Sequence, residues 1–189
     1  TIYPFADLRK GRVGAAFGQS IFTPEDTSSS DLVRNVRPYA GWVYGGISAH
    51  AETRRTGSNP SPDTLDTVEL DIGIVGPYAL GRQVQNGVHE LIGVAASNGW
   101  GHQLDNEPGV MLIGERRWRP SPWRALGLEL DMIPHIGGSL GNVMSFASAG
   151  AMFRVGQDLN IDYGPPLIRP SLSSLASVER TADFAWYVF

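Results

Sequence analysis

Apolar and polar residues alternate with a period of two along much of this chain. In Gly41–Thr53 the apolar side chains of one face are Val43, Ile47, Ala49 and Ala51, and the other face carries Trp42, Tyr44, Ser48, His50 and Glu52. The same alternation recurs in Asp66–Gly76 and Ala125–Pro134, where aliphatic residues oppose Thr67, Glu69, Asp71, Glu129 and Asp131. Successive side chains of a β-strand point to opposite faces, so these segments predict strands with one apolar and one polar face.

Four weaker segments complete the expected sheet: Arg12–Phe22, Val110–Trp118, Asn142–Val155 and Asp183–Phe189. Serine, aspartate, asparagine and proline gather in Thr23–Asn35 and Gly57–Asp66, which indicates loops or tight turns. With 23 glycines and 13 prolines punctuating the strands, the pattern predicts an all-β, antiparallel fold.

The alternation leaves two architectures open. An outer-membrane β-barrel turns its apolar face outward to lipid, encloses a polar interior and carries aromatic residues near the strand ends. In a soluble β-sandwich, the apolar faces of Val68–Ile74 and Leu126–Met132 would instead meet in a common core. Aromatic residues near the expected strand ends fit both, since soluble sheets also favour them: Trp42, Tyr44, Trp118, Trp123, Trp186 and Tyr187.

Composition narrows the classes of function. A length of 189 residues predicts one domain, residues 1–189. The absence of cysteine excludes disulfides, cysteine nucleophiles and cysteine zinc sites. A net charge of −4 with scattered basic residues argues against nucleic acid as a partner, and no protein partner is evident. The chain has no apolar run of the roughly 18 residues that a transmembrane helix needs, and no signal-peptide pattern at its start.

One segment departs from the β pattern, and we predict a helix over about residues 78–92. Pro77 can begin it and Gly93 can end it. Helical geometry places Leu80, Val84, Val88 and Leu91 on one stripe, and Tyr78, Arg82, Gln85 and His89 on the other side. In a functional interpretation His89 is a general base, Gln85 an orienting or oxyanion-side amide and Arg82 an anion binder. The alternative is a solvated polar face.

Other polar residues give weaker signals. Glu69, Asp71, Glu129 and Asp131 are compatible with paired acid–base carboxylates, but we expect them to line a barrel interior, balanced by Arg116 or Arg117. The spacing of His50, His102 and His135 does not predict a zinc site. Serine-hydrolase, P-loop and dinucleotide-binding motifs are not found in their required contexts.

A set of motifs in a fixed order is more specific than any of these features. RPYAGW occupies Arg37–Trp42, Gln85 and His89 form QxxxH, and NEPG occupies Asn106–Gly109. Further matching segments are Phe17–Asp26, Gly73–Pro77, Gly99–Trp100 and Gln103. Together they resemble the outer-membrane lipid A 3'-O-deacylase family, from about Phe17 to Trp118 and more weakly beyond.

The resemblance implies an up-and-down barrel in the outer membrane of a Gram-negative bacterium, with an esterase site between its wall and a short extracellular helix. It implies that His89 activates water to release the 3'-linked acyloxyacyl chain of lipid A, with calcium as cofactor. The family's catalytic positions fall on His89, Gln85 and Arg37. We expect Tyr39, Arg82 and Trp100 to bind the substrate, which is lipid A or lipopolysaccharide.

The chain also departs from the family pattern. The family's Glu-Asn-Asp segment, which helps to hold calcium, and a following Tyr-Thr-Asn-Gly stretch are not found before Phe17, and Val36 replaces a usually polar residue. We therefore expect an incomplete barrel whose main calcium ligands lie outside this chain. The alternatives are a non-catalytic barrel, acting as a pore or lipid-binding scaffold, and a soluble β-sandwich binding module.

Overall fold

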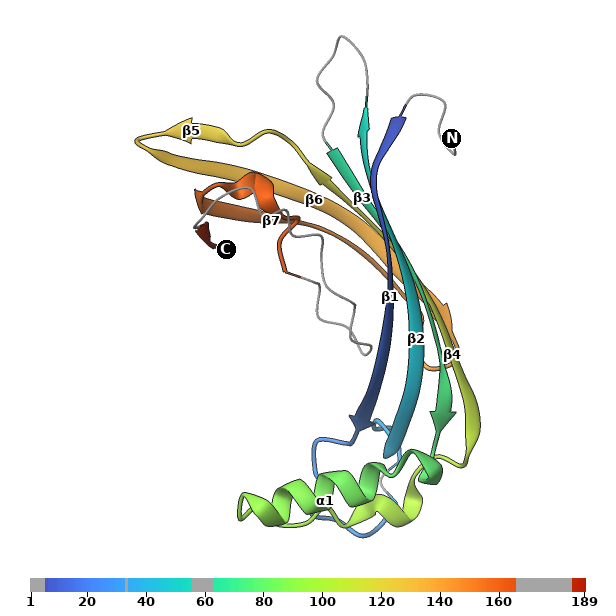
Figure 1. The fold of residues 1–189 in the computed structure, drawn as a ribbon. Helices are drawn as coiled ribbons and strands as arrows, with labels where there is room; N and C mark the ends of the chain where they lie inside the picture. The colour runs from blue at the N-terminus through green and yellow to red at the C-terminus, as the bar shows by residue number, and fades with distance from the viewer. Residues whose placement is uncertain (1–5, 33, 56–62, 166–184) are drawn as a thin grey trace.

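The protein forms one antiparallel β-sheet that curves like half of a barrel wall (Figure 1). The computed structural model describes residues 6–32, 34–55, 63–165 and 185–189. Neighbouring strands follow the order β1-β2-β3-β4-β6-β7-β8, and β5 pairs with β6. The expected antiparallel, up-and-down topology is therefore confirmed over the described strands.

The strands are β1 (Ala6–Phe22), β2 (Ala40–Arg55), β3 (Asp63–Val75), β4 (Glu107–Arg119), β5 (Trp123–Ala125), β6 (Leu128–Gly141), β7 (Phe146–Gln157) and β8 (Trp186–Val188). The helical elements are η1 (Pro77–Ala79), α1 (Gly81–Leu91), η2 (Gly99–His102) and η3 (Leu159–Ile161). In the described part of the chain, no helix is long and apolar enough to cross a membrane.

The two faces of the sheet differ as the alternation predicts. On β2 and β3 the side chains of Trp42, Tyr44, Glu52, Glu69 and Asp71 are buried. The apolar residues between them, such as Ile47, Val68 and Ile72, are exposed. The apolar faces of β3 and β6 thus do not meet in a common core, which rules out the β-sandwich for the described sheet.

Charged residues of the buried, concave face form ion pairs. Arg154 pairs with Asp131 and Asp162, and Arg119 pairs with Glu52 and Asp63. The segment that contains η3 lies on this concave side (Figure 1), where Tyr163 donates a hydrogen bond to Glu52.

Arg116 or Arg117 was expected to balance the charge of the carboxylates on the polar face. This expectation is wrong for Asp131, which pairs with Arg154, and for Glu129, which pairs with Arg124. Arg117 pairs instead with Glu115 on the same strand. Arg116 pairs with Asp66 across β3 and β4, and both of these residues belong to the rows of the apolar face.

Several expected boundaries also need correction. Leu126 and Gly127 both have positive φ (54° and 79°) and form the turn between β5 and β6, so β6 begins at Leu128 rather than Ala125 and runs beyond Pro134 to Gly141. β3 begins at Asp63, inside the segment expected to be a loop up to Asp66. β7 begins at Phe146 rather than Asn142. Residues 183 and 184 of the last expected strand lie outside the described residues.

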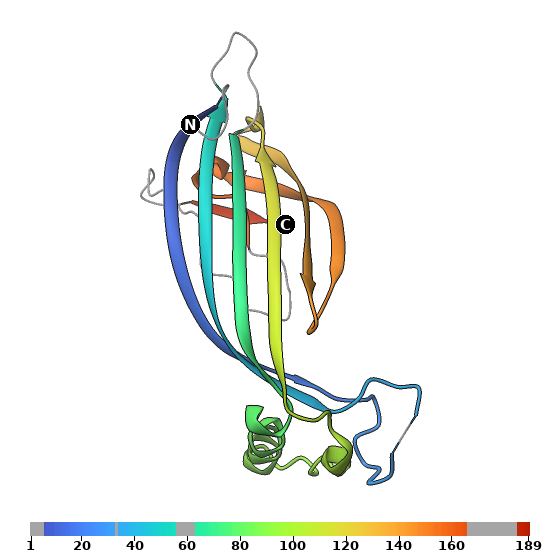
Figure 2. The same ribbon diagram turned by 90° about the vertical axis from the view of Figure 1, so that its right-hand side faces the viewer.

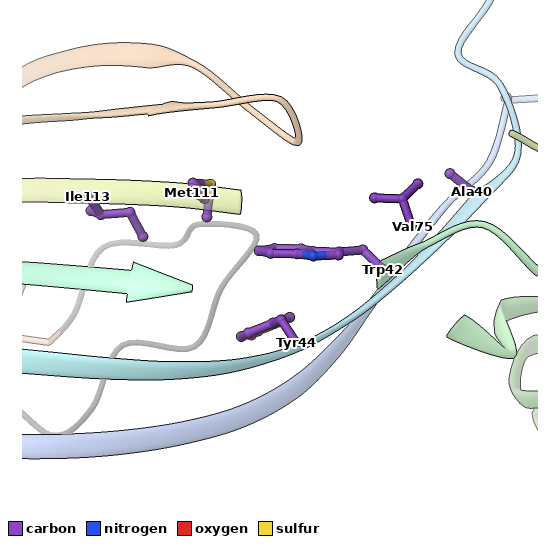
Figure 3. Packing of buried hydrophobic residues seen from close by; sticks show 6 residues of the cluster. All are labelled: Ala40, Trp42, Tyr44, Val75, Met111 and Ile113. Carbon is purple, nitrogen blue, oxygen red and sulfur yellow. The ribbon is translucent and has the colours of Figure 1, made fainter. Parts of the chain in front are cut away.

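An apolar cluster lies on the concave side near the end of the sheet where α1 lies (Figure 3). Its members are Ala40, Trp42, Tyr44, Val75, Met111 and Ile113. The rings of Trp42 and Tyr44 stack with centroids 4.3 Å apart. Both aromatic residues therefore point to the concave side and not to the exposed apolar face.

Candidate active site at the helical end of the sheet

The helical elements η1, α1 and η2 gather at the end of the sheet where β1 and β3 finish and β2 and β4 begin (Figures 1 and 2). The expected helix over 78–92 is divided. Pro77 begins the short η1, Leu80 adopts a left-handed conformation (φ 57°), and α1 proper runs from Gly81 to Leu91. Tyr78 consequently belongs to η1, and its backbone N–H donates to Asn106.

The far end of α1 is closed as predicted. Gly93 has a φ of 72°, a conformation that glycine adopts without steric penalty. Beyond it the chain folds back, and the N–H of Val94 donates to the carbonyl of His89 at 2.8 Å. The segment 94–98 therefore runs back along the polar side of the helix.

His89 is fixed by this returning segment. Its Nδ1 lies 2.7 Å from the carbonyl oxygen of Ala95, and a carbonyl can only accept a hydrogen bond. The ring proton of a neutral His89 is therefore assigned to Nδ1, which leaves the Nε2 lone pair unprotonated. The side chain is half-buried, so this basic nitrogen is held in one tautomer by the backbone.

Asn86 fastens the same segment to the helix. Its side-chain Oδ1 accepts from the N–H of Ser97 at 2.9 Å, and its Nδ2 donates to the carbonyl of Ser97 at 3.3 Å. Because Ser97 lies two residues after Ala95, this reciprocal pair fixes the carbonyl that orients His89. The sequence motifs do not point to Asn86, although helical geometry places it about 60° from His89.

Gln85 and two aromatic residues continue the site. The indole Nε1–H of Trp100 donates to Oε1 of Gln85 at 2.9 Å, and the ring of Trp100 packs on Tyr39 with centroids 5.0 Å apart. Trp100 and Tyr39 are buried. The structure thus joins Gln85, Trp100 and Tyr39 in one line of contacts, with His89 one helical turn from Gln85. The side-chain NH₂ group of Gln85 is a hydrogen-bond donor on the same side of the helix as His89.

The two arginines predicted from the sequence are both exposed. Arg37 is exposed and lines a small hollow together with Asp26, Tyr39 and His102. Hydrogen bonds from the Ser28 hydroxyl and backbone N–H lower the pKa of the Asp26 carboxyl, so the hollow presents a carboxylate beside a guanidinium. Arg82 lies exposed on the first turn of α1.

Two glycines let α1 approach the sheet. A side chain at Gly81 would meet the Trp100 ring at 2.7 Å, and one at Gly41 would meet the backbone of Gly81 at 3.0 Å. Gly41 belongs to the RPYAGW motif, and the close contact gives one physical reason for its glycine. The beginning of α1 is therefore fixed against β2 and Trp100.

A metal site is not formed by the described residues alone. No three histidine, aspartate or glutamate side chains come together there in a way that could hold a metal ion. The site's evident chemistry is therefore a tautomerically fixed imidazole, a side-chain amide, buried aromatic rings and two arginines.

This fold and site define a class of protein. A curved antiparallel sheet with an exposed apolar face and a charged, buried concave face is typical of an outer-membrane β-barrel, here with a polar site beside the helix at one end. The model of the family described as outer membrane protein LpxR matches residues 2–189. The chain belongs to this family of outer-membrane proteins.

A solved structure supports the same fold. The chain is similar to LpxR from Salmonella typhimurium, with a TM-score of 0.73 and 20% sequence identity over 93% of this chain. The match covers 58% of that protein, so this chain spans little more than half of its length. No curated protein matches the chain.

Proposed function

We propose that the protein is an esterase that removes the 3'-linked acyloxyacyl chain of lipid A by means of a water molecule activated by His89. The observation that carries the proposal is the hydrogen bond from Nδ1 of His89 to the carbonyl of Ala95, which leaves Nε2 as a base. The resemblance of the motifs to the lipid A 3'-O-deacylase family and the family membership of the chain support the choice of substrate.

The proposed reaction is general-base hydrolysis. Nε2 of His89 takes a proton from water, and the water oxygen attacks the ester carbonyl carbon to form a tetrahedral oxyanion. The intermediate collapses by breaking the bond to the sugar 3' oxygen, which receives the proton from His89. The products are a carboxylic acid and a free 3' hydroxyl group.

Gln85 and the arginines supply polar contacts in this scheme. The indole N–H of Trp100 donates to the side-chain oxygen of Gln85 and thereby sets the orientation of the amide. The NH₂ group of Gln85 can then donate toward the oxyanion. Arg37 and Arg82 are exposed cations, and we assign them to anionic groups of lipid A. Tyr39 and Trp100 support the wall of the substrate site.

The first experiment replaces the proposed base. Purified His89→Ala protein should hydrolyse lipid A at least about 100-fold more slowly than the unaltered protein, because general-base catalysis typically contributes factors of about 10² to 10⁴. Mass spectrometry of the lipid A product measures the loss of the 3' acyloxyacyl group.

Gln83→Ala is the matched control, because Gln83 is exposed on the same helix and outside the proposed site. It should retain full activity. Equal rates for His89→Ala and the unaltered protein would remove His89 from the mechanism, and the absence of activity in all three proteins would favour the non-catalytic barrel.

Calcium dependence is a separate proposal, based on the resemblance alone. The described residues form no evident metal site, so no step above passes through the ion. Calcium binds hard oxygen ligands, so the chelator EGTA should abolish deacylation and added Ca²⁺ should restore it. Activity that survives EGTA would contradict calcium dependence without affecting the role of His89.

A further inference from the structure

The helix α1 exposes an apolar stripe that the proposed chemistry does not use. Its members lie on one side of α1 and its flanking residues, and all are exposed: Leu80, Val84, Val88, Leu91 and Ile92. Leu91 retains 85% of its accessible surface. The opposite side of the helix makes the contacts, through Gln85, Asn86 and His89. The amphipathic helix is thus seated by its polar side and leaves its apolar side uncovered.

The contacts that attach η1 and α1 to the sheet show that the apolar stripe continues the exposed apolar face of β1 and β2. On β1, Val13 and Phe17 belong to the exposed apolar row, and the next residue of that row, Gln19, donates its side-chain N–H to the carbonyl of Ala79 in η1. On β2, Ile47 and Val43 lie in the row that ends at Gly41, which packs against Gly81. The apolar rows of two strands therefore lead to the beginning of α1.

The direction of the helix also fits a membrane surface. α1 runs roughly crosswise to the strands at their ends (Figure 1). The strands of an outer-membrane barrel cross the bilayer, so a helix placed crosswise at their ends lies near the membrane plane. Amphipathic helices in this orientation bury their apolar side at the boundary of headgroups and acyl chains.

From this continuity we infer that the occupant of the apolar stripe is the acyl-chain region of the membrane leaflet that surrounds this end of the barrel. The helix is then an interfacial anchor as well as the carrier of His89. Its apolar side enters the leaflet, and its polar side holds the returning segment 94–98. The inference concerns the bilayer itself and does not depend on the esterase activity.

Spin labelling can test the placement residue by residue. The sequence contains no cysteine, so each single-cysteine variant carries one nitroxide label. Val88→Cys and Leu91→Cys place the label on the stripe, and Gln83→Cys and Glu90→Cys place it on exposed polar flanks of the same helix. Val13→Cys on β1 is the reference for a lipid-facing position.

The labelled proteins are reconstituted in phosphatidylcholine vesicles without lipid A, and collisions with oxygen and with the water-soluble complex NiEDDA are measured. Labels at positions 88 and 91 should resemble position 13, with an oxygen-to-NiEDDA accessibility ratio several-fold above that of positions 83 and 90. Val84→Cys provides a further stripe position if one variant fails to insert.

Three results would overturn the inference. Equal ratios at positions 91 and 90 would place the stripe in water. An oxygen-rich environment that appears only after lipid A is added would make the stripe a substrate site. Spectral broadening between labels that increases with the protein-to-lipid ratio would make it a contact between two copies of the protein.

Discussion

At the scale of single residues, the proposed base depends on a backbone carbonyl rather than on a carboxylate. Ala95 contributes to the site only through its carbonyl oxygen, so the position of that oxygen depends on the fold of residues 94–98. Asn86 fixes this segment through two hydrogen bonds to Ser97. We therefore regard Asn86 as a positioning residue for His89.

Replacement of Asn86 by alanine should lower kcat by up to about tenfold with little change in KM. The reason is that a hydrogen bond contributes about 0.5–1.5 kcal/mol, and 1.36 kcal/mol corresponds to a factor of ten in rate. Nitrogen NMR of His89 in detergent micelles should show a mixture of ring tautomers in Asn86→Ala. Asn86→Asp keeps the acceptor for the Ser97 N–H and should recover part of the rate. An unchanged rate together with a single Nδ1–H tautomer would contradict this role.

At the scale of elements, two leucines occupy left-handed conformations at boundaries that the sequence pattern does not reveal. Leu80 separates η1 from α1, and Leu126 begins the turn of the β5–β6 hairpin together with Gly127. A left-handed conformation costs a residue with a side chain roughly 1–2 kcal/mol, and asparagine tolerates it better than leucine. Paired positive φ values are typical of a type I′ turn, which favours Asn-Gly.

Leu126→Asn should therefore stabilise the protein by about 0.5–1 kcal/mol. Leu126 is fully exposed, so the replacement removes no packing. The measurement is the midpoint of urea unfolding of the detergent-solubilised protein. Leu140→Asn is the control, since Leu140 is an exposed leucine within β6, where asparagine is unfavourable, and it should destabilise. A lower midpoint for Leu126→Asn would contradict the turn argument.

At the scale of the whole molecule, the concave face is held by buried charges. Arg154 contacts Asp131, Asp162 and the carbonyl of Leu159, and it thereby ties β6 and β7 to the segment around η3. Its side chain is fully buried. Removing one partner of such a pair leaves a buried charge without compensation, and this is costlier than removing the pair.

Arg154→Met should accordingly destabilise the fold by about 3–5 kcal/mol, as measured by chemical unfolding in detergent. Combining it with Asp131→Leu should recover part of the loss. Arg124→Met is the matched control, because the Arg124 side chain is 77% exposed and its pair with Glu129 is expected to contribute less than about 1 kcal/mol. Similar losses for the two single variants would show that burial does not set the strength of these pairs.

The sequence predicts the sheet well where alternation is strong. On β2 and β3 the faces were predicted residue by residue, because one row is aliphatic and the other polar or aromatic. The β5–β6 turn could not be predicted, because Leu126 continues the apolar alternation although its backbone is left-handed. Similarly, the residue pattern of Pro77–Leu80 continues that of α1, so the sequence predicts one helix where the structure has two.

The residues of the candidate site could be predicted in part from the sequence. His89 and Gln85 follow from helical spacing and motif resemblance, since both signals are local. The roles of Asn86 and of the Ala95 carbonyl depend on the return of the chain after Gly93, and residue types do not encode that geometry. The arginine partners of Glu129 and Asp131 likewise depend on strand register and on the segment around η3.

The contact between Gly41 and Gly81 has a consequence for how this protein can evolve. A side chain at either position would meet the backbone of the other at 3.0 Å, which is tighter than ordinary van der Waals contact, so the two sites are coupled although they lie forty positions apart in the sequence. A lineage that replaced one glycine would have to move the beginning of the helix by a few tenths of an ångström. We therefore expect substitutions at these two positions to arise together with changes at Trp100, or to be eliminated by selection.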